Sequence, residues 1–426
     1  MTVYLLCYAA AFLFARSGHH FLAGTVLMLS ALYLYWQDYR RWGSLIHLRG
    51  LFSLFWIGGQ GVSCLKLSRL QAPWSGTTWI CFLLAYLGFW VTFELLQRRF
   101  GTKRVSGMPV RKNQDMAEPL FHSIVAITVI SLAAFLLEAA VLGYIPLLVR
   151  GVPHAYSEFH LSGVHYFTVS CVLVPGLSVL YFWCGGSRRT WKNWMVTGAA
   201  LVSVLIPLLC VSRFQLVFAM ILAVFTYGAV RRKLSLWYLA GTFVVLVPLY
   251  VLLTVARSHD VAYLNGIFEM KSSNMPIFIS QPYIYIANNY DNFNCLTEQL
   301  PAHTWGIRML FPLWALTGLK FRFPELTGFP LYLTKTELTT VTLFYDAYYD
   351  CGILGVLLFS CLLGAVSWYL VQRLEKLKNP AGYLLYAQFA MYMVLSFFTT
   401  WFSNPTTWFY FFVTGAVILY CEWKGY

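Results

Sequence analysis

The sequence has little charge and few acidic residues. Only 11% of its 426 residues are Asp, Glu, Lys or Arg, and 16 are acidic, whereas 59% are hydrophobic. No ordinary soluble core needs so much apolar surface. The apolar residues also come in blocks of about 17–25 residues, the length that crosses about 30 Å of hydrocarbon. The composition therefore predicts an all-α polytopic membrane protein.

Several chemical signatures are also missing. The ten cysteines form no CxxC pair, so neither a disulfide framework nor a zinc site is expected. No Gly-rich phosphate loop and no DxD signature suggests a nucleotide-sugar donor. A net charge of +14 would suggest nucleic acid as the partner of a soluble protein. Here most of the 30 lysines and arginines fall in short loops expected to face the cytoplasm, where they set orientation, so no nucleic acid partner is expected.

The hydrophobic blocks predict about twelve transmembrane helices in a single integral membrane domain, residues 1–426. An even number of spans places both termini in the cytoplasm. The first block has neither preceding basic residues nor a following cleavage site, so it is expected to be retained. The blocks cover residues 3–15, 21–36, 50–65, 76–96, 119–142, 163–184, 194–211, 214–230, 235–256, 342–371, 381–401 and 406–421.

The segment 257–341 between the ninth and tenth blocks is too long for a simple connector. It is rich in aromatic residues, and half of the 16 acidic residues lie between positions 257 and 350. Long loops are usually functional or disordered, and the aromatic content favours order. We therefore expect a folded extracytoplasmic cap. Within it, residues 305–321 are too short and too charged at their ends to span, which predicts an interfacial or re-entrant helix.

Charged residues gather at the expected outer boundary of the membrane. Asp346 and Asp350 open the tenth block four residues apart, where a helix would place both on one face despite a repulsion of about a few tenths of a kcal/mol. The positive end of the helix explains one carboxylate more easily than two. Arg213 and Arg257 stand at helix ends of similar depth, where the alternative is that they simply extend to the membrane surface.

A second cluster, residues 283–294, mixes aromatic and amide side chains that suit sugar rings and hydroxyls, although a polar loop with Asx turns is the simpler interpretation. On the tenth block, Gly352, Gly355 and Gly364 are expected to serve close helix packing. Histidines and a glutamate in the outer loop at 152–167 match no zinc spacing. The candidate sugar-binding residues are Tyr283, Tyr285, Asn288, Asn289 and Tyr290, together with Tyr345 and Tyr349 beside the carboxylates.

These features together resemble the Wzy-type bacterial polymerases of oligosaccharide repeat units. The resemblance rests on a long outer loop late in the chain, an arginine at each of two preceding helix ends, and a Tyr-Asp pair before a Gly-containing helix. The matching segments are 211–228, 254–260, 283–293 and 339–364, with some likeness at 143–167.

The resemblance implies a GT-C-like membrane glycosyltransferase in the bacterial plasma (inner) membrane. Such an enzyme joins repeat units of O-antigen (lipopolysaccharide), capsule or exopolysaccharide at the outer face. Its substrates are oligosaccharides on undecaprenyl diphosphate, it works among membrane lipids, and it needs no cofactor. A chain-length regulator is a further candidate partner.

The chemistry of that reaction assigns roles to the candidates. The diphosphate leaving group needs fixed cations, and Arg213, Arg257 and Arg308 are proposed for it. The acceptor hydroxyl needs a base, with Asp350 the first candidate and Asp346 the second. This mechanism requires Arg213, Arg257 and Asp350 to converge.

Other assignments stay open. His303 and His259 are reserve bases. Asp346 and Asp350 could instead bind Mg²⁺ against the diphosphate, although fixed arginines already supply the charge. An O-antigen ligase, which moves finished polymer to a lipid acceptor, and a polysaccharide flippase or transporter are the main alternatives. A membrane acyltransferase is less favoured because the histidines lie mostly in outer loops.

Overall fold

The structure, a computed structural model, is all-helical over the residues it describes, as predicted. These are residues 1–101, 113–149, 155–232, 234, 237–238, 240–242, 244, 261–272, 274–374 and 376–424. Extended pairing in this part of the chain is limited to one isolated antiparallel bridge between Ser68 and Met270.

Six of the described helical segments are long and apolar enough to cross a membrane, which indicates a membrane protein. They agree with six of the predicted blocks, whereas the block at 235–256 lies largely outside the described residues. The segments are Gly76–Phe100, Gln114–Leu142, His165–Trp183, Thr190–Leu209, Arg213–Arg231 and Tyr345–Leu374.

The chain divides into two compact units, and the candidate site lies in the first. Unit 1 comprises Met1–Arg104, Asp260–Gln372 and Tyr392–Thr407. Its N-terminal helices are α1 (Thr2–Arg16), α2 (His20–Trp42), α3 (Leu48–Phe52), the π-helical turn η1 (Ser53–Ile57), α4 (Gly58–Cys64) and α5 (Gly76–Phe100). Its later elements are α13 (Val261–Phe268), α14 (Ile277–Gln299), α15 (Phe311–Leu316), α16 (Leu319–Arg322), η5 (Pro324–Leu326), most of α17 (Tyr345–Leu374) and η6 (Trp401–Ser403).

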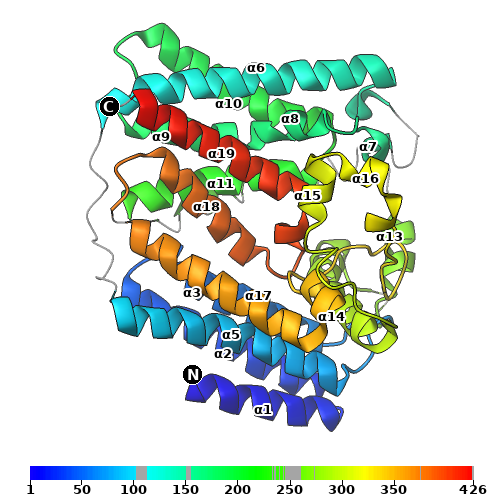
Figure 1. Cartoon of the computed structure of the whole chain (residues 1–426). Coiled ribbons are helices and arrows are strands. Elements are labelled where there is room, and N and C mark those ends of the chain that lie inside the picture. Colours follow the sequence, from blue (N-terminus) through cyan, green and yellow to red (C-terminus); the bar gives the residue numbers. More distant parts are fainter. Residues whose placement is uncertain are drawn as a thin grey trace. The chain divides into compact units, whose positions relative to one another are not determined.

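Helices α5 and α17 run side by side in unit 1 (Figure 1). A Cβ atom on Gly364 of α17 would lie 2.4 Å from the carbonyl oxygen of Phe89 on α5, so only glycine allows this approach, which confirms its predicted packing role. Gly352 serves a different purpose. It has φ +59° at a kink in α17, and a Cβ there would lie 2.9 Å from Nε2 of His303. The prediction of a packing role for Gly352 was therefore wrong.

The expected interfacial helix at 305–321 is not continuous, so that prediction was also wrong. Trp305 and Gly306 both have positive φ and form a turn before the first helix. The six-residue α15 then stops, and Gly318, in the left-handed region, separates it from the four-residue α16. Two short helices form in place of one long helix, because the positive φ angles at Trp305, Gly306 and Gly318 are incompatible with a continuous α-helix.

Unit 2 comprises Val105–His259, Arg373–Met391 and Trp408–Tyr426. Helix α18 (Ala381–Val394) ends short of the predicted residue 401, and the chain then forms turns up to η6. The helices that lie in it, wholly or in large part, are α6 (Ala117–Leu142), α7 (Ala155–Glu158), α8 (His165–Val169), α9 (Val174–Trp183), α10 (Thr190–Leu209), α11 (Arg213–Arg231), α18 (Ala381–Val394) and α19 (Pro405–Lys424); short 3₁₀ turns lie at 114–116, 146–148 and 170–173.

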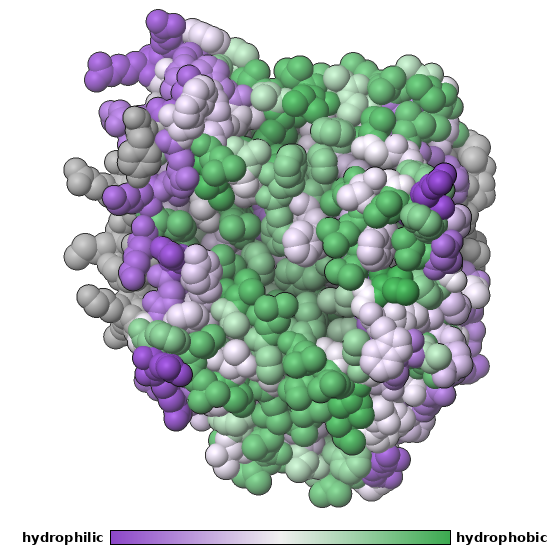
Figure 2. Space-filling view, in the orientation of Figure 1, coloured by the Kyte–Doolittle hydropathy of each residue, from purple (hydrophilic) through white to green (hydrophobic). Residues whose placement is uncertain are grey.

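The basic loops of unit 2 meet at one end of its helices. Lys192, at the start of α10, pairs with Glu118 at the start of α6. Arg232, which follows α11, donates from Nη2 to the carbonyl oxygen of Leu374 at the end of α17 (3.0 Å). In the upper part of Figure 2, hydrophilic side chains gather where α6 begins, whereas the long side of α6 is hydrophobic. Within the described part of this unit, these basic residues therefore lie at helix ends and in the adjoining loops.

Candidate functional site

The two carboxylates singled out in the sequence open α17 and are both buried. Asp346 is 5% exposed and Asp350 1%. The backbone leaves helical geometry at Cys351 and Gly352, directly after them. The two acids therefore lie on a short helical segment of their own, ahead of the long apolar helix.

Asp350 holds the preceding loop in place. Its Oδ1 accepts a hydrogen bond from the hydroxyl of Thr304 and another from the backbone N–H of Arg308 (3.1 Å). Its Oδ2 accepts from the backbone N–H of Met309 (2.8 Å). Three donors from one loop satisfy both oxygens, so this carboxylate folds the loop onto α17 and has little capacity left for a substrate.

Asp346 is arranged differently, because its partners are side chains. Nε of Arg308 donates to its Oδ1 (2.7 Å), and the hydroxyl of Ser403 donates to its Oδ2. The guanidinium of Arg308 lies over the ring of Tyr349, 4.4 Å from the centroid, in a cation–π contact. Within the described part of the chain, the two Nη atoms of Arg308 have no hydrogen-bond partner, and its side chain is 15% exposed.

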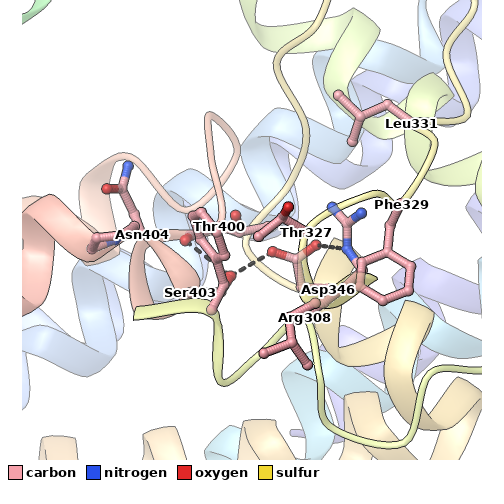
Figure 3. Close-up of a pocket in the computed structure, with 11 residues that line it drawn as sticks. Arg308, Thr327, Phe329, Leu331, Asp346, Thr400, Ser403 and Asn404 are labelled. Carbon is pink, nitrogen blue, oxygen red and sulfur yellow. Dashed lines mark hydrogen bonds and ion pairs between the residues drawn. The ribbon is translucent and has the colours of Figure 1, made fainter. Parts of the chain in front are cut away.

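Arg308, Asp346 and Ser403 face a pocket of about 430 Å³ in unit 1 (Figure 3). The arrangement offers a cation with unused donors beside a carboxylate and a hydroxyl, within a partly apolar wall. Such a site can bind an anion and accept a proton from a neighbouring group. The other lining residues are Phe311, Leu326, Thr327, Phe329, Leu331, Thr400, Asn404 and Pro405.

The tyrosines of α17 form the buried side of this site. The Tyr345 hydroxyl accepts from the backbone N–H of Tyr332 (2.8 Å) and donates to its carbonyl oxygen (3.2 Å). Tyr345 is fully buried, and Tyr349 is 3% exposed beneath Arg308. Both residues fix the arginine and the loop rather than presenting an open ring face.

The amides of α14, predicted to bind sugar, hold the segment that leads into α17. Oδ1 of Asn289 accepts from the hydroxyl of Thr340 (2.6 Å), and its Nδ2 donates to the carbonyl oxygen of Tyr285 (2.6 Å). Oδ1 of Asn288 accepts from the hydroxyl of Thr334 (2.7 Å). Asn288 and Asn289 are both at most 1% exposed. Their side chains therefore anchor the segment that precedes α17 to α14.

The tyrosines of α14 also pack inward. The Tyr290 hydroxyl donates to the carbonyl oxygen of Trp56 (2.9 Å). The Tyr283 hydroxyl donates to Oε1 of Gln71 and accepts from the N–H of Leu67 (2.8 Å). Burial raises the pKa of the Tyr283 phenol, which keeps it a donor.

Tyr285 is only half-buried and lies 6.3 Å, between ring centroids, from Phe398. Of the predicted sugar-binding residues on α14, Tyr285 is therefore the one whose ring is partly accessible to a ligand.

The remaining candidates lie elsewhere. Arg213 is the first residue of α11, is 7% exposed and belongs to unit 2. Arg257 and His259 lie outside the described residues. His303 packs against Tyr348 and contacts the carbonyl oxygen of Tyr349 through Nδ1 (3.2 Å). The convergence of Arg213, Arg257 and Asp350 thus stays a prediction.

Glu138 and His165, also in unit 2, form a separate polar cluster. Nδ1 of His165 lies 3.1 Å from Oε1 of Glu138, which also accepts from the N–H of Leu161 (2.9 Å). His154 lies outside the described residues. Among the residues that are described, no three His, Cys, Asp or Glu side chains form a metal-binding group.

Ser403 is the site residue that the sequence did not reveal. It lies 57 positions from Asp346 in the chain, in a 3₁₀ turn after α18. The only local signal is the Ser-Asn-Pro turn, in which Oδ1 of Asn404 accepts from the N–H of Thr406 (2.9 Å) at the start of α19. That signal predicts a helix start but not its proximity to a carboxylate.

Comparisons with models of protein families, with curated proteins and with solved structures found no match for this chain.

Proposed function

We propose that this chain is a membrane glycosyltransferase that polymerises oligosaccharide repeat units carried on undecaprenyl diphosphate. The observation that carries the proposal is the pocket in which Arg308, Asp346 and Ser403 meet. A cation with unused donors beside a carboxylate matches the two needs of transfer from a lipid diphosphate. The resemblance to Wzy-type polymerases supplies the substrate class.

The role of Arg308 follows from charge. As the bond between the anomeric carbon and the diphosphate oxygen breaks, negative charge grows on the leaving group, and a fixed guanidinium stabilises it. The Nε of Arg308 donates to Asp346, its two Nη atoms have no hydrogen-bond partner among the described residues, and Arg308 lines the pocket. Tyr349 beneath the guanidinium holds it in position.

Asp346 is assigned as the base in preference to Asp350. Asp346 lines the pocket and accepts two hydrogen bonds, one on each oxygen, whereas Asp350 does not line it and accepts three from the loop. The acceptor hydroxyl oxygen would attack the anomeric carbon and form the new glycosidic bond. Its proton would pass to the Asp346 carboxylate, and the lipid diphosphate would leave as the anion without needing a proton. Ser403 would orient the carboxylate.

The topology belongs to the same proposal. We propose about twelve spans, a GT-C-like arrangement, both termini in the cytoplasm and the segment 257–341 outside the plasma membrane of a bacterium. Six apolar helices and the gathering of basic loops at one end of unit 2 support it. Tyr285 is the residue of α14 best placed to touch glycan, and a chain-length regulator is a candidate partner.

The decisive test is to incubate the purified chain with a synthetic undecaprenyl-diphosphate repeat unit and to separate the products by size. A ladder of lengths supports the polymerase. Absence of a ladder, with the polymer moved intact to a lipid acceptor, would instead identify a ligase. Lipid-linked units that cross a vesicle membrane without new bonds would identify a flippase.

A further inference from the structure

Unit 2 contains a second, separate pocket, at the end where its basic loops meet. Its volume is about 570 Å³, and it lies between the start of α6 and the loop from α9 to α10. It does not involve any residue of the proposed catalytic site. The lining residues are Gln114, Ala117, Glu118, Gly185, Gly186, Ser187, Arg188, Arg189 and Lys192.

The loop on one side of this pocket is held rigidly. Gly185 and Gly186 have φ values of +103° and +63°, conformations that favour glycine. Oδ1 of Asn193 accepts from the N–H of Ser187 (3.1 Å) and from the hydroxyl of Tyr181 (2.8 Å), and Nδ2 of Asn193 donates to the carbonyl oxygen of Ser187 (3.1 Å). The turn that carries the next two arginines is thus preorganised.

The charge of the pocket is unbalanced. Lys192 is neutralised by its ion pair with Glu118. Arg188 and Arg189 are exposed, and over the described ranges neither guanidinium has an ion-pair partner. Two forked cations beside a fixed turn suit the oxygens of a phosphate group.

The surroundings place this pocket at a membrane surface. Trp191 and Trp194, on the first turns of α10, are 52% and 72% exposed. Tryptophan is enriched where helices leave the hydrocarbon and meet the headgroups. Both α6 and α10 are among the helices able to cross a membrane. A ligand here would have its phosphate at the arginines and apolar chains beside α6 or α10.

We infer that this pocket binds the phosphate group of an anionic phospholipid. Arg188 and Arg189 supply the positive charge, and the turn that Asn193 holds fixes where they leave the backbone. The two exposed tryptophans indicate that the pocket lies at a membrane surface. A water-soluble phosphate ester would satisfy the same charged groups but not the apolar flank.

The test uses the full chain purified in detergent and titrated calorimetrically with short-chain phosphatidylglycerol, phosphatidylcholine and glycerol 3-phosphate. We expect phosphatidylglycerol to bind more tightly than phosphatidylcholine. The double variant R188Q/R189Q should weaken it by about 30-fold, because each of the two basic residues contributes about 1 kcal/mol at a membrane surface. R188K/R189K, which keeps the charge but loses the guanidinium fork, should retain only part of the affinity.

The matched control is K376Q/K378Q, which removes two exposed cations from another basic loop of unit 2 that does not line the pocket. If it weakens binding as much as R188Q/R189Q, only net charge matters and the inference is overturned. Unchanged affinity in R188Q/R189Q would overturn it as well. Equal affinity for glycerol 3-phosphate and phosphatidylglycerol would overturn the assignment to a phospholipid, because the acyl chains would then contribute nothing to binding.

Discussion

Helix α14 and the start of α17 both place polar side chains among buried aromatic rings, but they use them in opposite ways. In α14, Nδ2 of Asn292 donates to the carbonyl oxygens of Leu338 and Thr340 (2.8 Å each), and its Oδ1 accepts from the N–H of Thr334 (2.8 Å). At the start of α17, the ion pair of Arg308 and Asp346 borders an open pocket.

The difference teaches how to separate a structural polar group from a functional one. A buried group whose donors and acceptors are all used by its own fold contributes to stability. A group that keeps unused capacity beside a cavity can act on a ligand. Asp350 and Asp346 show the same contrast within one helical turn.

The sharpest test of this contrast is Arg308→Ala. Loss of the cation facing the leaving group should reduce the polymerisation rate by about 10²–10³-fold. Arg308→Lys should recover part of the rate and keeps Asp346 paired. The measurement is the rate of ladder formation by purified protein that unfolds cooperatively on heating. Arg322→Ala, at an exposed arginine of the same loop, should leave the rate unchanged; an equal loss there would remove Arg308 from the site.

Asp346→Asn should have the next largest effect. The amide keeps the size of the side chain but cannot take the proton, so the rate should fall by about 10²-fold while substrate binding changes little. The exposed Glu325→Gln serves as the control for a lost acid in the same loop. Full activity in Asp346→Asn would exclude it as the base.

Asp350→Ala should act on stability first. It leaves the backbone N–H groups of Arg308 and Met309 without their acceptor, which we expect to cost about 2–3 kcal/mol of unfolding free energy. Thermal unfolding in detergent measures this cost. Activity should fall because the loop that carries Arg308 loosens. A variant with unaltered stability and no activity would instead return Asp350 to the role of base.

Asn292→Ala should give the smallest effect and complete the comparison. The unpaired carbonyl oxygens of Leu338 and Thr340 should lower stability by about 1–2 kcal/mol, with little change in activity per folded molecule. Thr336→Ala, at an exposed threonine in the same segment, should be neutral. Loss of activity without loss of stability would give α14 a direct role in binding.

The sequence by itself determined the helical class and six apolar helices. It also singled out Asp346, Asp350 and Arg308 as candidate site residues. These follow from local composition, because a run of apolar residues or a pair of acids four positions apart can be recognised without knowing which residues contact it in the fold. It also indicated a folded segment before α17, although not its division into short helices.

Only the tertiary structure decided which acid borders a cavity and that Ser403 completes its environment. It also showed that both amide atoms of Asn289 and of Asn292 on α14 are used in hydrogen bonds within the fold. The physical reason is that hydrogen-bond satisfaction depends on partners brought together over long stretches of chain. Thr304 and Arg308 are 46 and 42 positions from Asp350, and Ser403 is 57 from Asp346. Tertiary packing brings these residues into contact, and no local sequence pattern predicts which distant residues will meet.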